Sequence, residues 1–210
     1  GRRPNGIYIP RFRNLGGASD RKDYKRGFGY QGAASRGNWE ETVAELSYGK
    51  DFKDSILKPG GWRMGIGGFG EVLPYEDNRM TLDYEKLDSW GLPTVTFDAD
   101  LQENEFNMRK DMQESAVEML EKAGLRDVKG HDGPTGLGLG IHEMGTARMG
   151  RNRKTSVLNG NNQLHDVPNV YVTDGAFMTS ASCVNPSLTY MAFTARAADH
   201  AVKELKKGNI

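Results

Sequence analysis

The sequence contains a single cysteine among its 210 residues, Cys183. An internal disulfide and a metal site built from several cysteines are therefore excluded. No apolar run approaches the roughly 20 residues that a helix needs to cross a bilayer. The 28 basic and 28 acidic residues balance to a formal net charge of zero. This balance removes the general electrostatic argument for nucleic-acid binding.

The basic residues are concentrated near the start of the sequence, where residues 1–30 contain eight lysines and arginines against two aspartates. Such a basic N-terminal patch could attract an anionic ligand. A non-catalytic ligand-binding or interaction module that uses the patch is therefore one alternative for the function. Lysine and arginine also protect the edges of β-sheets, and an ordinary solvated surface is the interpretation that we favour.

The overall composition is that of a globular domain rich in turns. Apolar residues make up 37% of the sequence and charged residues 27%, and both values are ordinary for a folded protein. The 27 glycines favour many turns over a helical bundle. Short β-rich runs bounded by turn residues predict strands at 6–9, 28–33, 62–73, 79–83 and 94–97, and a buried strand at 170–173.

Helical periodicity is clearest over residues 100–123, where methionine, leucine and alanine recur on one face. Asp98 or Asp100 can cap the start of this helix, and Gly124 suits the left-handed position just past its end. We interpret the methionine stripe as core packing rather than as a cofactor site.

Two further helical regions are expected. The last one runs from Pro186 to about residue 205, because Asn185 favours the cap position and proline suits the first turn. Residues 40–57 predict one or two helices, interrupted near Gly49.

Two motifs fail when their context is considered. Residues 65–70 match Gly-x-Gly-x-x-Gly, but this pattern binds a dinucleotide only between a strand and a helix, and here Pro74 follows shortly after. His142-Glu143 begins like a zinc-protease motif, but Thr146 stands where the second histidine should be. We therefore predict no metal-binding residues.

The last seventy residues contain a series of linked motifs. They are His142-x-x-Gly145-Thr146-x-x-Met149-Gly150, then Asn-Val-Tyr-Val-Thr-Asp-Gly at 169–175, Asn-Pro-Ser-Leu-Thr at 185–189 and Ala-Arg-Ala-Ala-Asp at 195–199. In order, spacing and residue type they resemble the glucose-methanol-choline (GMC) oxidoreductase family. A weaker resemblance extends upstream to about residue 65. Details at 155–164 look closest to the gluconate dehydrogenase-like branch, which acts on sugar acids and polyols.

The resemblance implies an α+β fold in which an antiparallel sheet carries helices on one face. It divides the chain into a substrate-binding domain at 1–140 and a C-terminal catalytic segment at 141–210. That segment would pack on an FAD-binding domain of the same protein, outside this sequence. The whole protein would oxidise a CH–OH group of a sugar acid, sugar or polyol, pass a hydride to flavin N5, and use an electron-acceptor partner. The fragment alone is expected to be inactive.

The resemblance also assigns catalytic roles. His142 would be the general base that removes the hydroxyl proton, a task suited to imidazole, or else a histidine hydrogen-bonded in a glycine-rich turn. Asn185 would hold the substrate oxygen, would cap the last helix, or would do both through different atoms. If both side chains serve one oxygen, they should face the same cleft.

A second group of residues would contact FAD. They are Asp174, Gly175, Ala176, Asn185, Pro186, Ser187 and Thr189. The turn at 174–176 would lie against the ribityl and pyrophosphate groups, although Asp174 could equally be a plain turn residue. The start of the last helix would lie beside flavin N1 and C2=O, because a helix N-terminus stabilises negative charge.

Two other side chains leave alternatives open. Cys183 could attach a flavin covalently, but a small buried thiol is the interpretation that we favour. Arg148 could contact an anionic substrate, and we expect a structural salt bridge instead.

Overall fold

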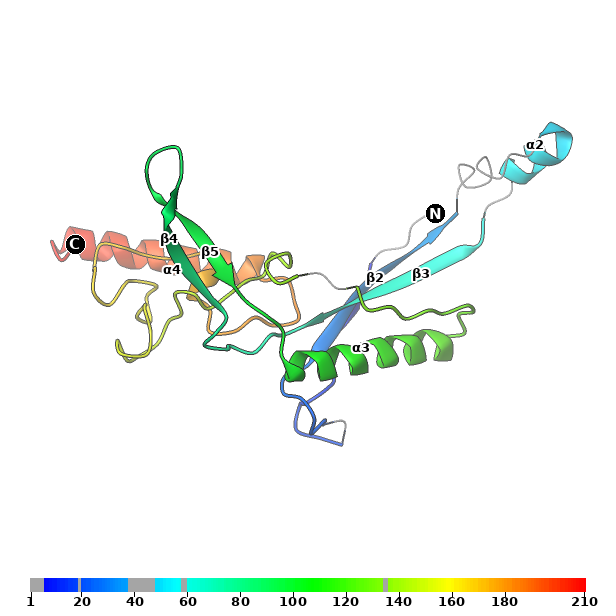
Figure 1. Ribbon diagram of the computed structural model, residues 1–210, viewed down its shortest axis with the longest axis horizontal. Coiled ribbons are helices and arrows are strands. Elements are labelled where there is room, and N and C mark those ends of the chain that lie inside the picture. The colour runs from blue at the N-terminus through cyan, green and yellow to red at the C-terminus, as the bar shows by residue number, and fades with distance from the viewer. Residues whose placement is uncertain (1–5, 19, 38–47, 58–59, 134–135) are drawn as a thin grey trace.

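The computed structural model describes residues 6–18, 20–37, 48–57, 60–133 and 136–210. Its elements in chain order are β1 (Ile7–Ile9), β2 (Phe28–Arg36), α2 (Gly49–Leu57), β3 (Trp62–Gly70), β4 (Arg79–Leu87), β5 (Pro93–Asp98), α3 (Glu103–Lys122), the 3-10 turn η1 (Gly175–Phe177) and α4 (Ser187–Lys206). The helical stretch predicted at 40–47 lies outside the described residues. The molecule is elongated, with α2 and the tips of β2 and β3 at one end and α4 at the other (Figure 1).

The first lobe is an antiparallel sheet of β1, β2 and β3, in that spatial order, with α3 packed on one face. Its core forms between the sheet and the helix and consists of Tyr24, Phe28, Tyr30 and Met108, with Ile9, Phe12, Ile66, Met112, Ala116 and Met119 packed around them. The predicted α+β class, a sheet covered by helix on one face, is therefore confirmed.

The methionine stripe of α3 packs on glycines of β3. A Cβ atom added to Gly70 would lie 2.8 Å from Met108 Cε, so the helix approaches the strand where side chains are absent. Gly65–Gly70 therefore belongs to β3 and does not form the strand-to-helix turn of a dinucleotide site. The prediction of core packing for the stripe is confirmed.

The predicted ends of this helix are correct only at its C-terminus. Gly124 adopts a left-handed φ of +88° just past the end, as expected. The helix begins at Glu103, and the predicted aspartate cap is wrong. The backbone N–H of Gln102 donates instead to Glu105 Oε2 at 3.1 Å. Glu105 is buried and also accepts from Tyr75 Oη at 2.8 Å, which explains why the helix starts one turn later.

A buried polar cluster ties the loop before β2 to α3. Asp111 is 3% exposed and accepts hydrogen bonds from Arg13 at 2.9 and 3.0 Å and from Tyr24 Oη at 2.5 Å. Arg13 also donates to Ser115 Oγ at 3.1 Å. Four groups therefore satisfy one another in a site largely removed from water, as buried charges require.

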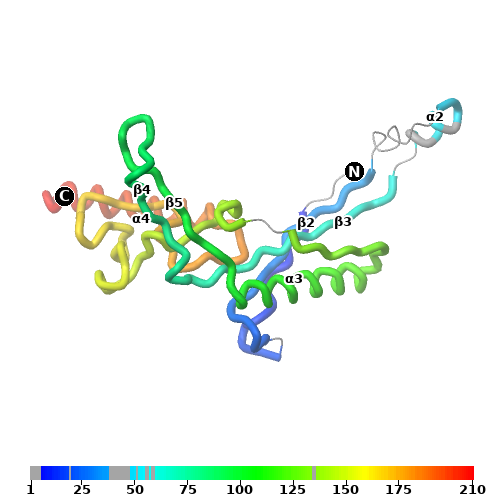
Figure 2. The backbone as a smooth tube through the Cα atoms, viewed as in Figure 1, coloured from blue at the N-terminus to red at the C-terminus, as the bar shows by residue number. Residues whose placement is uncertain are grey.

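After α3 the chain runs back along the helix (Figure 2). Arg109 donates to Asp132 on this returning segment at 2.5 Å. A Cβ on Gly130 would lie 2.8 Å from Val117 Cγ2, so the segment lies close against α3.

A separate hairpin, β4–β5, projects from the molecule (Figure 1). Met80 pairs with Phe97 and Leu82 with Val95, so these four apolar side chains share one face of the hairpin. They are 47–74% exposed, and Trp90 near the tip is 83% exposed. A two-stranded hairpin is marginal by itself in water, so its apolar face is suited to packing against another surface.

The C-terminal lobe consists of irregular chain packed on α4. Phe177 is 1% exposed and its ring stacks on that of Phe193 at 4.8 Å between centroids. Arg196 of α4 donates to the backbone oxygen of Gly160 at 2.6 Å and to Asn162 Oδ1 at 3.2 Å. These contacts fix the helix to the loops that precede it.

The buried strand predicted at 170–173 is wrong. In this range a single bridge forms, between Tyr171 and Gln163, and Val170 is 40% exposed. The facing segment turns at Asn162, where φ is +63°. Because that turn bends the facing chain away from an extended path, a longer ladder cannot form.

Candidate functional site

An open cleft of about 2930 Å³ runs between the two lobes. Its walls come from β3, from the side of α3 that carries Met112 and Gln113, from the returning segment, and from the described part of the glycine-rich loop that precedes His142. Residues 179–184 close its C-terminal side. His142 is half-buried and lies in the wall, so the structure places the predicted base at a solvent-filled space large enough for a small organic substrate.

The segment after His142 is held against the turn that contains Asp174. The backbone N–H of Ala147 donates to the Ala176 carbonyl at 3.0 Å, and that of Met149 to the Phe177 carbonyl at 2.9 Å. Gly145 adopts a φ of +93°, which favours glycine. These contacts bring two of the sequence motifs into one unit.

Gly175 allows a close approach between three parts of the chain. A Cβ atom at this position would lie 2.7 Å from Tyr190 Oη and 2.8 Å from the Glu143 carbonyl oxygen. Burial, followed by the charges of Asp174 and Glu143, raises the pKa of the Tyr190 phenol. Because Gly175 has no side chain, the His142 segment, the 174–176 turn and α4 can pack together.

Asp174 acts as a turn residue in this structure. Its Oδ1 accepts from the backbone N–H of Ala176 at 2.9 Å and thereby caps η1. The side chain is exposed. The plain structural interpretation of Asp174 is thus seen directly, and it leaves an exposed carboxylate beside the start of α4.

The helix cap predicted at Asn185 is wrong. The helix begins at Ser187, Pro186 holds the position before it, and no side chain caps the start. The Asn185 side chain is directed to the sheet instead, where its Nδ2 lies 3.5 Å from Gln31 Oε1. Because proline separates Asn185 from the helix, the amide is too far along the chain to reach the first turn's N–H groups.

Asn185 is not among the described residues that line the cleft. Its preceding neighbour Val184 and its partner Gln31 both are. Ser187 is exposed and Thr189 half-buried. The structure therefore groups His142 with the 174–176 turn and leaves Asn185 just outside the cleft wall, beside Gln31, so the two side chains do not line one cleft as expected.

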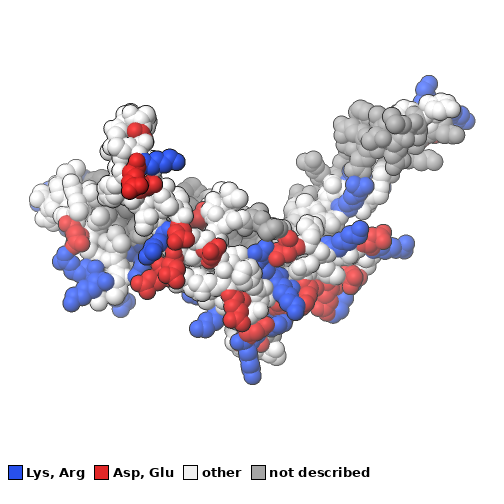
Figure 3. All heavy atoms as spheres, in the orientation of Figure 1, with Lys and Arg blue, Asp and Glu red and all other residues white. Residues whose placement is uncertain are grey.

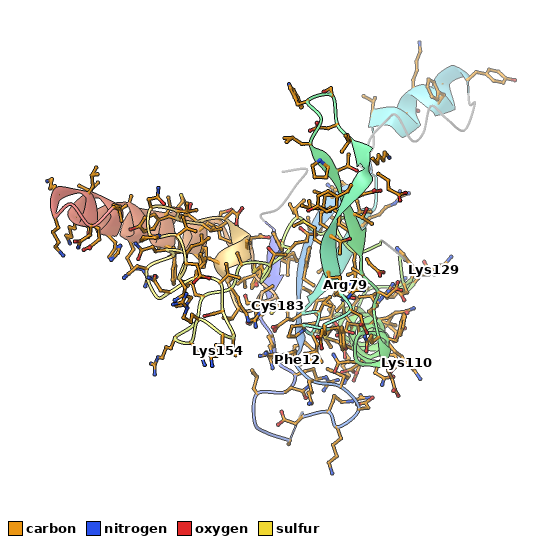
Figure 4. The ribbon with its side chains drawn as sticks, turned by 60° about the vertical axis from the view of Figure 1, so that its left-hand side comes forward. Phe12, Arg79, Lys110, Lys129, Lys154 and Cys183 are labelled. Atoms are coloured by element: carbon orange, nitrogen blue, oxygen red, sulfur yellow. The ribbon has the colours of Figure 1, made fainter. Side chains whose placement is uncertain are left out.

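Cys183 lies at the junction between the C-terminal lobe and the sheet (Figure 4). It is half-buried and forms no disulfide. Its carbonyl oxygen accepts from Tyr8 Oη at 3.1 Å, and its Sγ would lie 3.3 Å from a Cβ on Gly29. The thiol thus packs against the middle strand of the sheet.

Arg148 does not form the salt bridge that we expected. It is exposed and donates to the Thr155 carbonyl oxygen at 2.6 Å. This contact closes the loop after the His142 motif, which a cation can do without an acidic partner. Among the described residues no group of three His, Cys, Asp or Glu side chains is arranged to hold a metal ion.

Sequence reasoning missed two polar residues of the cleft, Gln31 and Glu71. Gln31 lies in the middle of β2, where no motif indicates a site. Glu71 is 7% exposed, lies 3.6 Å from Arg26, and has its pKa raised by burial. No sequence signal indicated that Glu71 would line the cleft.

These features define a class of protein: an α+β module whose open cleft contains a histidine and lies next to the start of a helix. The GMC oxidoreductase profile matches residues 74–194. The chain is 34% identical over 187 residues to 2-methyl-1,2-propanediol dehydrogenase of Mycolicibacterium austroafricanum, covering 85% of this chain and 33% of that protein. It belongs to the GMC oxidoreductase family.

Two further relatives match in the same way. Paromamine 6'-oxidase of Streptomyces fradiae is 34% identical over 125 residues, covering 60% of this chain and 23% of that protein. Fructose dehydrogenase large subunit of Gluconobacter japonicus is 29% identical over 168 residues, covering 76% and 29%. The chain thus spans a third or less of the length of these relatives.

Proposed function

We propose that this chain is the substrate-facing, C-terminal part of an FAD-dependent oxidoreductase that oxidises a CH–OH group of a sugar acid, sugar or polyol. The observation that carries the proposal is the cleft wall containing His142, bonded through its segment to the 174–176 turn next to α4. The names of the relatives, which include a propanediol dehydrogenase and a fructose dehydrogenase, favour polyol and sugar substrates.

In this proposal His142 removes the hydroxyl proton of the substrate. It is half-buried in the wall of an open cleft, so a ligand in the cleft can reach it. A positioned imidazole of this kind is the usual general base at neutral pH. Asn185 donates a hydrogen bond from its amide to the oxygen that loses the proton.

The residues around α4 suit the edge and chain of a flavin. The first N–H groups of a helix are free of intrahelical partners and attract negative charge. Ser187 and Thr189 lie in that first turn, and the exposed Asp174 carboxylate beside it can accept from ribityl hydroxyls. The bound flavin would supply the hydride acceptor at N5.

Exposed apolar surface supports an FAD-binding domain as the partner of this chain. The chain exposes 15309 Å², whereas a compact protein of 23.2 kDa would expose about 9,700 Å². Along α4, Leu188, Met191, Val202 and Leu205 are 50–76% exposed. Together with the apolar face of β4–β5, these exposed side chains are suited to being covered by a partner domain.

The proposed protein needs an electron acceptor, which could be a small molecule or a protein partner. No helix among the described residues is sufficiently long and apolar to cross a membrane.

The basic N-terminal patch offers little support for the alternative, a non-catalytic binding module. Among its described residues, Arg13 and Arg21 pair with Asp111, and Arg26 pairs with Glu71. Arg11 donates to the Asn14 carbonyl oxygen at 2.6 Å. In Figure 3 the acidic and basic side chains around α3 and this loop are interspersed. These arginines therefore serve the fold more than an anionic ligand.

We expect the isolated chain to bind FAD weakly or not at all, and the full-length protein to bind it tightly. Most pyrophosphate and adenine contacts need a glycine-rich turn and helix N-terminus of the dinucleotide-binding kind, which this chain lacks. Titration of both proteins with FAD, followed by flavin fluorescence, measures the difference. Micromolar or tighter binding by the isolated chain would contradict our placement of the cofactor, and a full-length protein free of flavin would support the binding-module alternative.

A further inference from the structure

The face of the sheet opposite α3 supports the segment that leads to Asn185. Three contacts define this support: Tyr8 Oη donates to the Cys183 carbonyl at 3.1 Å, Gly29 packs on Cys183 Sγ, and Gln31 Oε1 lies 3.5 Å from Asn185 Nδ2. Tyr8 and Gln31 are register partners in β1 and β2. The three contacts therefore come from adjacent positions of one rigid surface.

The same face carries few other side chains. Gln31 pairs with Gly67, and Gly29 with Phe69, across β2 and β3, and partners in register point to the same side. Gln31 thus stands beside a strand position without a side chain, next to the cleft. A Cβ on Gly29 would lie 2.8 Å from the Ile9 carbonyl oxygen, so this position is restricted to glycine by backbone packing.

The Gln31 amide is held in a constrained place. Its Nε2 is buried and has no hydrogen-bond partner among the described residues, while its Oε1 accepts from Asn185. An unpaired buried donor costs about 1–3 kcal/mol, so proteins rarely keep one without a compensating role. The Oε1 atom of the same amide supplies such a role, because it accepts from Asn185 and thereby fixes the orientation of that side chain.

We propose that Gln31 is a positioning residue that, with Tyr8, orients Asn185 for its contact with the substrate oxygen. An amide nitrogen carries two hydrogens. When Gln31 accepts one hydrogen of the Asn185 amide, the direction of the second hydrogen is fixed. The proposal rests on the proposed function, since Asn185 must touch substrate for its orientation to matter.

The test uses the full-length flavoprotein and measures flavin reduction by the alcohol substrate in anaerobic stopped-flow. Gln31→Met keeps the side-chain length and removes the acceptor. We expect the limiting reduction rate to fall about 10-fold, within the range that a small misplacement produces, while substrate Kd stays within about twofold of wild type. Tyr8→Phe, which removes one hydroxyl and little volume, should act in the same direction by a smaller factor.

The decisive readout is the double variant Gln31→Met/Asn185→Ala. If Gln31 acts through Asn185, the double variant reduces no more slowly than Asn185→Ala alone, because interacting residues are non-additive. Tyr48→Phe, an exposed residue just before α2, is the matched control and should reduce at the wild-type rate. Flavin content and thermal midpoint identify variants that have lost their fold.

Two outcomes overturn the proposal. One is a Gln31→Met protein that reduces at the wild-type rate, and the other is a double variant whose loss is the product of the two single losses. A wild-type protein that no alcohol reduces would instead overturn the proposed function on which the inference rests.

Discussion

Replacing His142 with alanine in the full-length protein is expected to slow flavin reduction about 10²- to 10⁴-fold, the usual contribution of a positioned general base. FAD content should stay close to wild type, because the backbone contacts of the segment involve Ala147 and Met149 rather than the imidazole. Anaerobic stopped-flow with the natural alcohol measures the rate.

A matched histidine serves as the control. His200 lies in α4 and its Nδ1 is 3.0 Å from Tyr171 Oη, away from the residues of the cleft wall. His200→Ala should leave the reduction rate within about twofold of wild type, since distant surface contacts have small effects. An unchanged rate in His142→Ala would reduce His142 to a structural residue and remove the proposed base.

The largest expected effect on stability belongs to Asp111→Ala. Removing one partner of a buried ion pair leaves the other charge unpaired and costs about 3–5 kcal/mol. Here the substitution would remove the carboxylate to which both Arg13 and Tyr24 donate. We expect a clearly lower urea midpoint for the full-length protein. Asp132→Ala removes the partner of Arg109 at a half-exposed site and should cost about 1 kcal/mol or less.

Asp111 also predicts a dependence of stability on pH. Burial raises the pKa of its carboxyl, but the hydrogen bonds from Tyr24 and Arg13 outweigh burial, and the pKa lies below its usual value. A lowered folded-state pKa stabilises the protein fully above the unfolded value of about 4. The stabilisation is lost as the pH falls through the folded pKa. The difference in unfolding free energy between wild type and Asp111→Ala should therefore shrink below about pH 4, and a constant difference down to pH 2 would contradict this account.

Regular elements were predictable where local pattern and packing agree. Residues 100–123 show a helical stripe, and its methionines do pack on the sheet. The strands at 28–33 and 62–73 were predicted because short β-rich runs there are bounded by turn residues. Periodicity reports which face is buried, and for this helix burial decided the structure.

Helix and strand ends were less predictable. The start of α3 is set by Glu105, which reaches back to the Gln102 backbone, and acidic residues on either side make several caps equally plausible in sequence. The strand expected at 170–173 failed because a turn at Asn162 bends its partner. The first error reflects a choice among local caps that Leu73 and Tyr75 decide by donating to Glu105, and the second reflects a turn outside the predicted strand.

The candidate site was predictable only as separate motifs. The sequence indicated His142, Asp174 and Asn185 through their family-like spacing, and the structure shows that backbone bonds join the first two motifs. The sequence did not indicate Gln31, because a glutamine within a strand has no characteristic spacing. Its proposed role follows only from its contact with Asn185. Tertiary contacts of this kind are invisible to a local pattern.

The visible absorption spectrum of the full-length protein, recorded without oxygen before and after adding sugar, sugar-acid and polyol substrates, tests the central claim most directly. We predict an oxidised flavin spectrum that bleaches on addition of at least one of these alcohols, and bleaching far more slowly in His142→Ala. A full-length protein with bound flavin that none of these alcohols bleaches would contradict the proposed reaction.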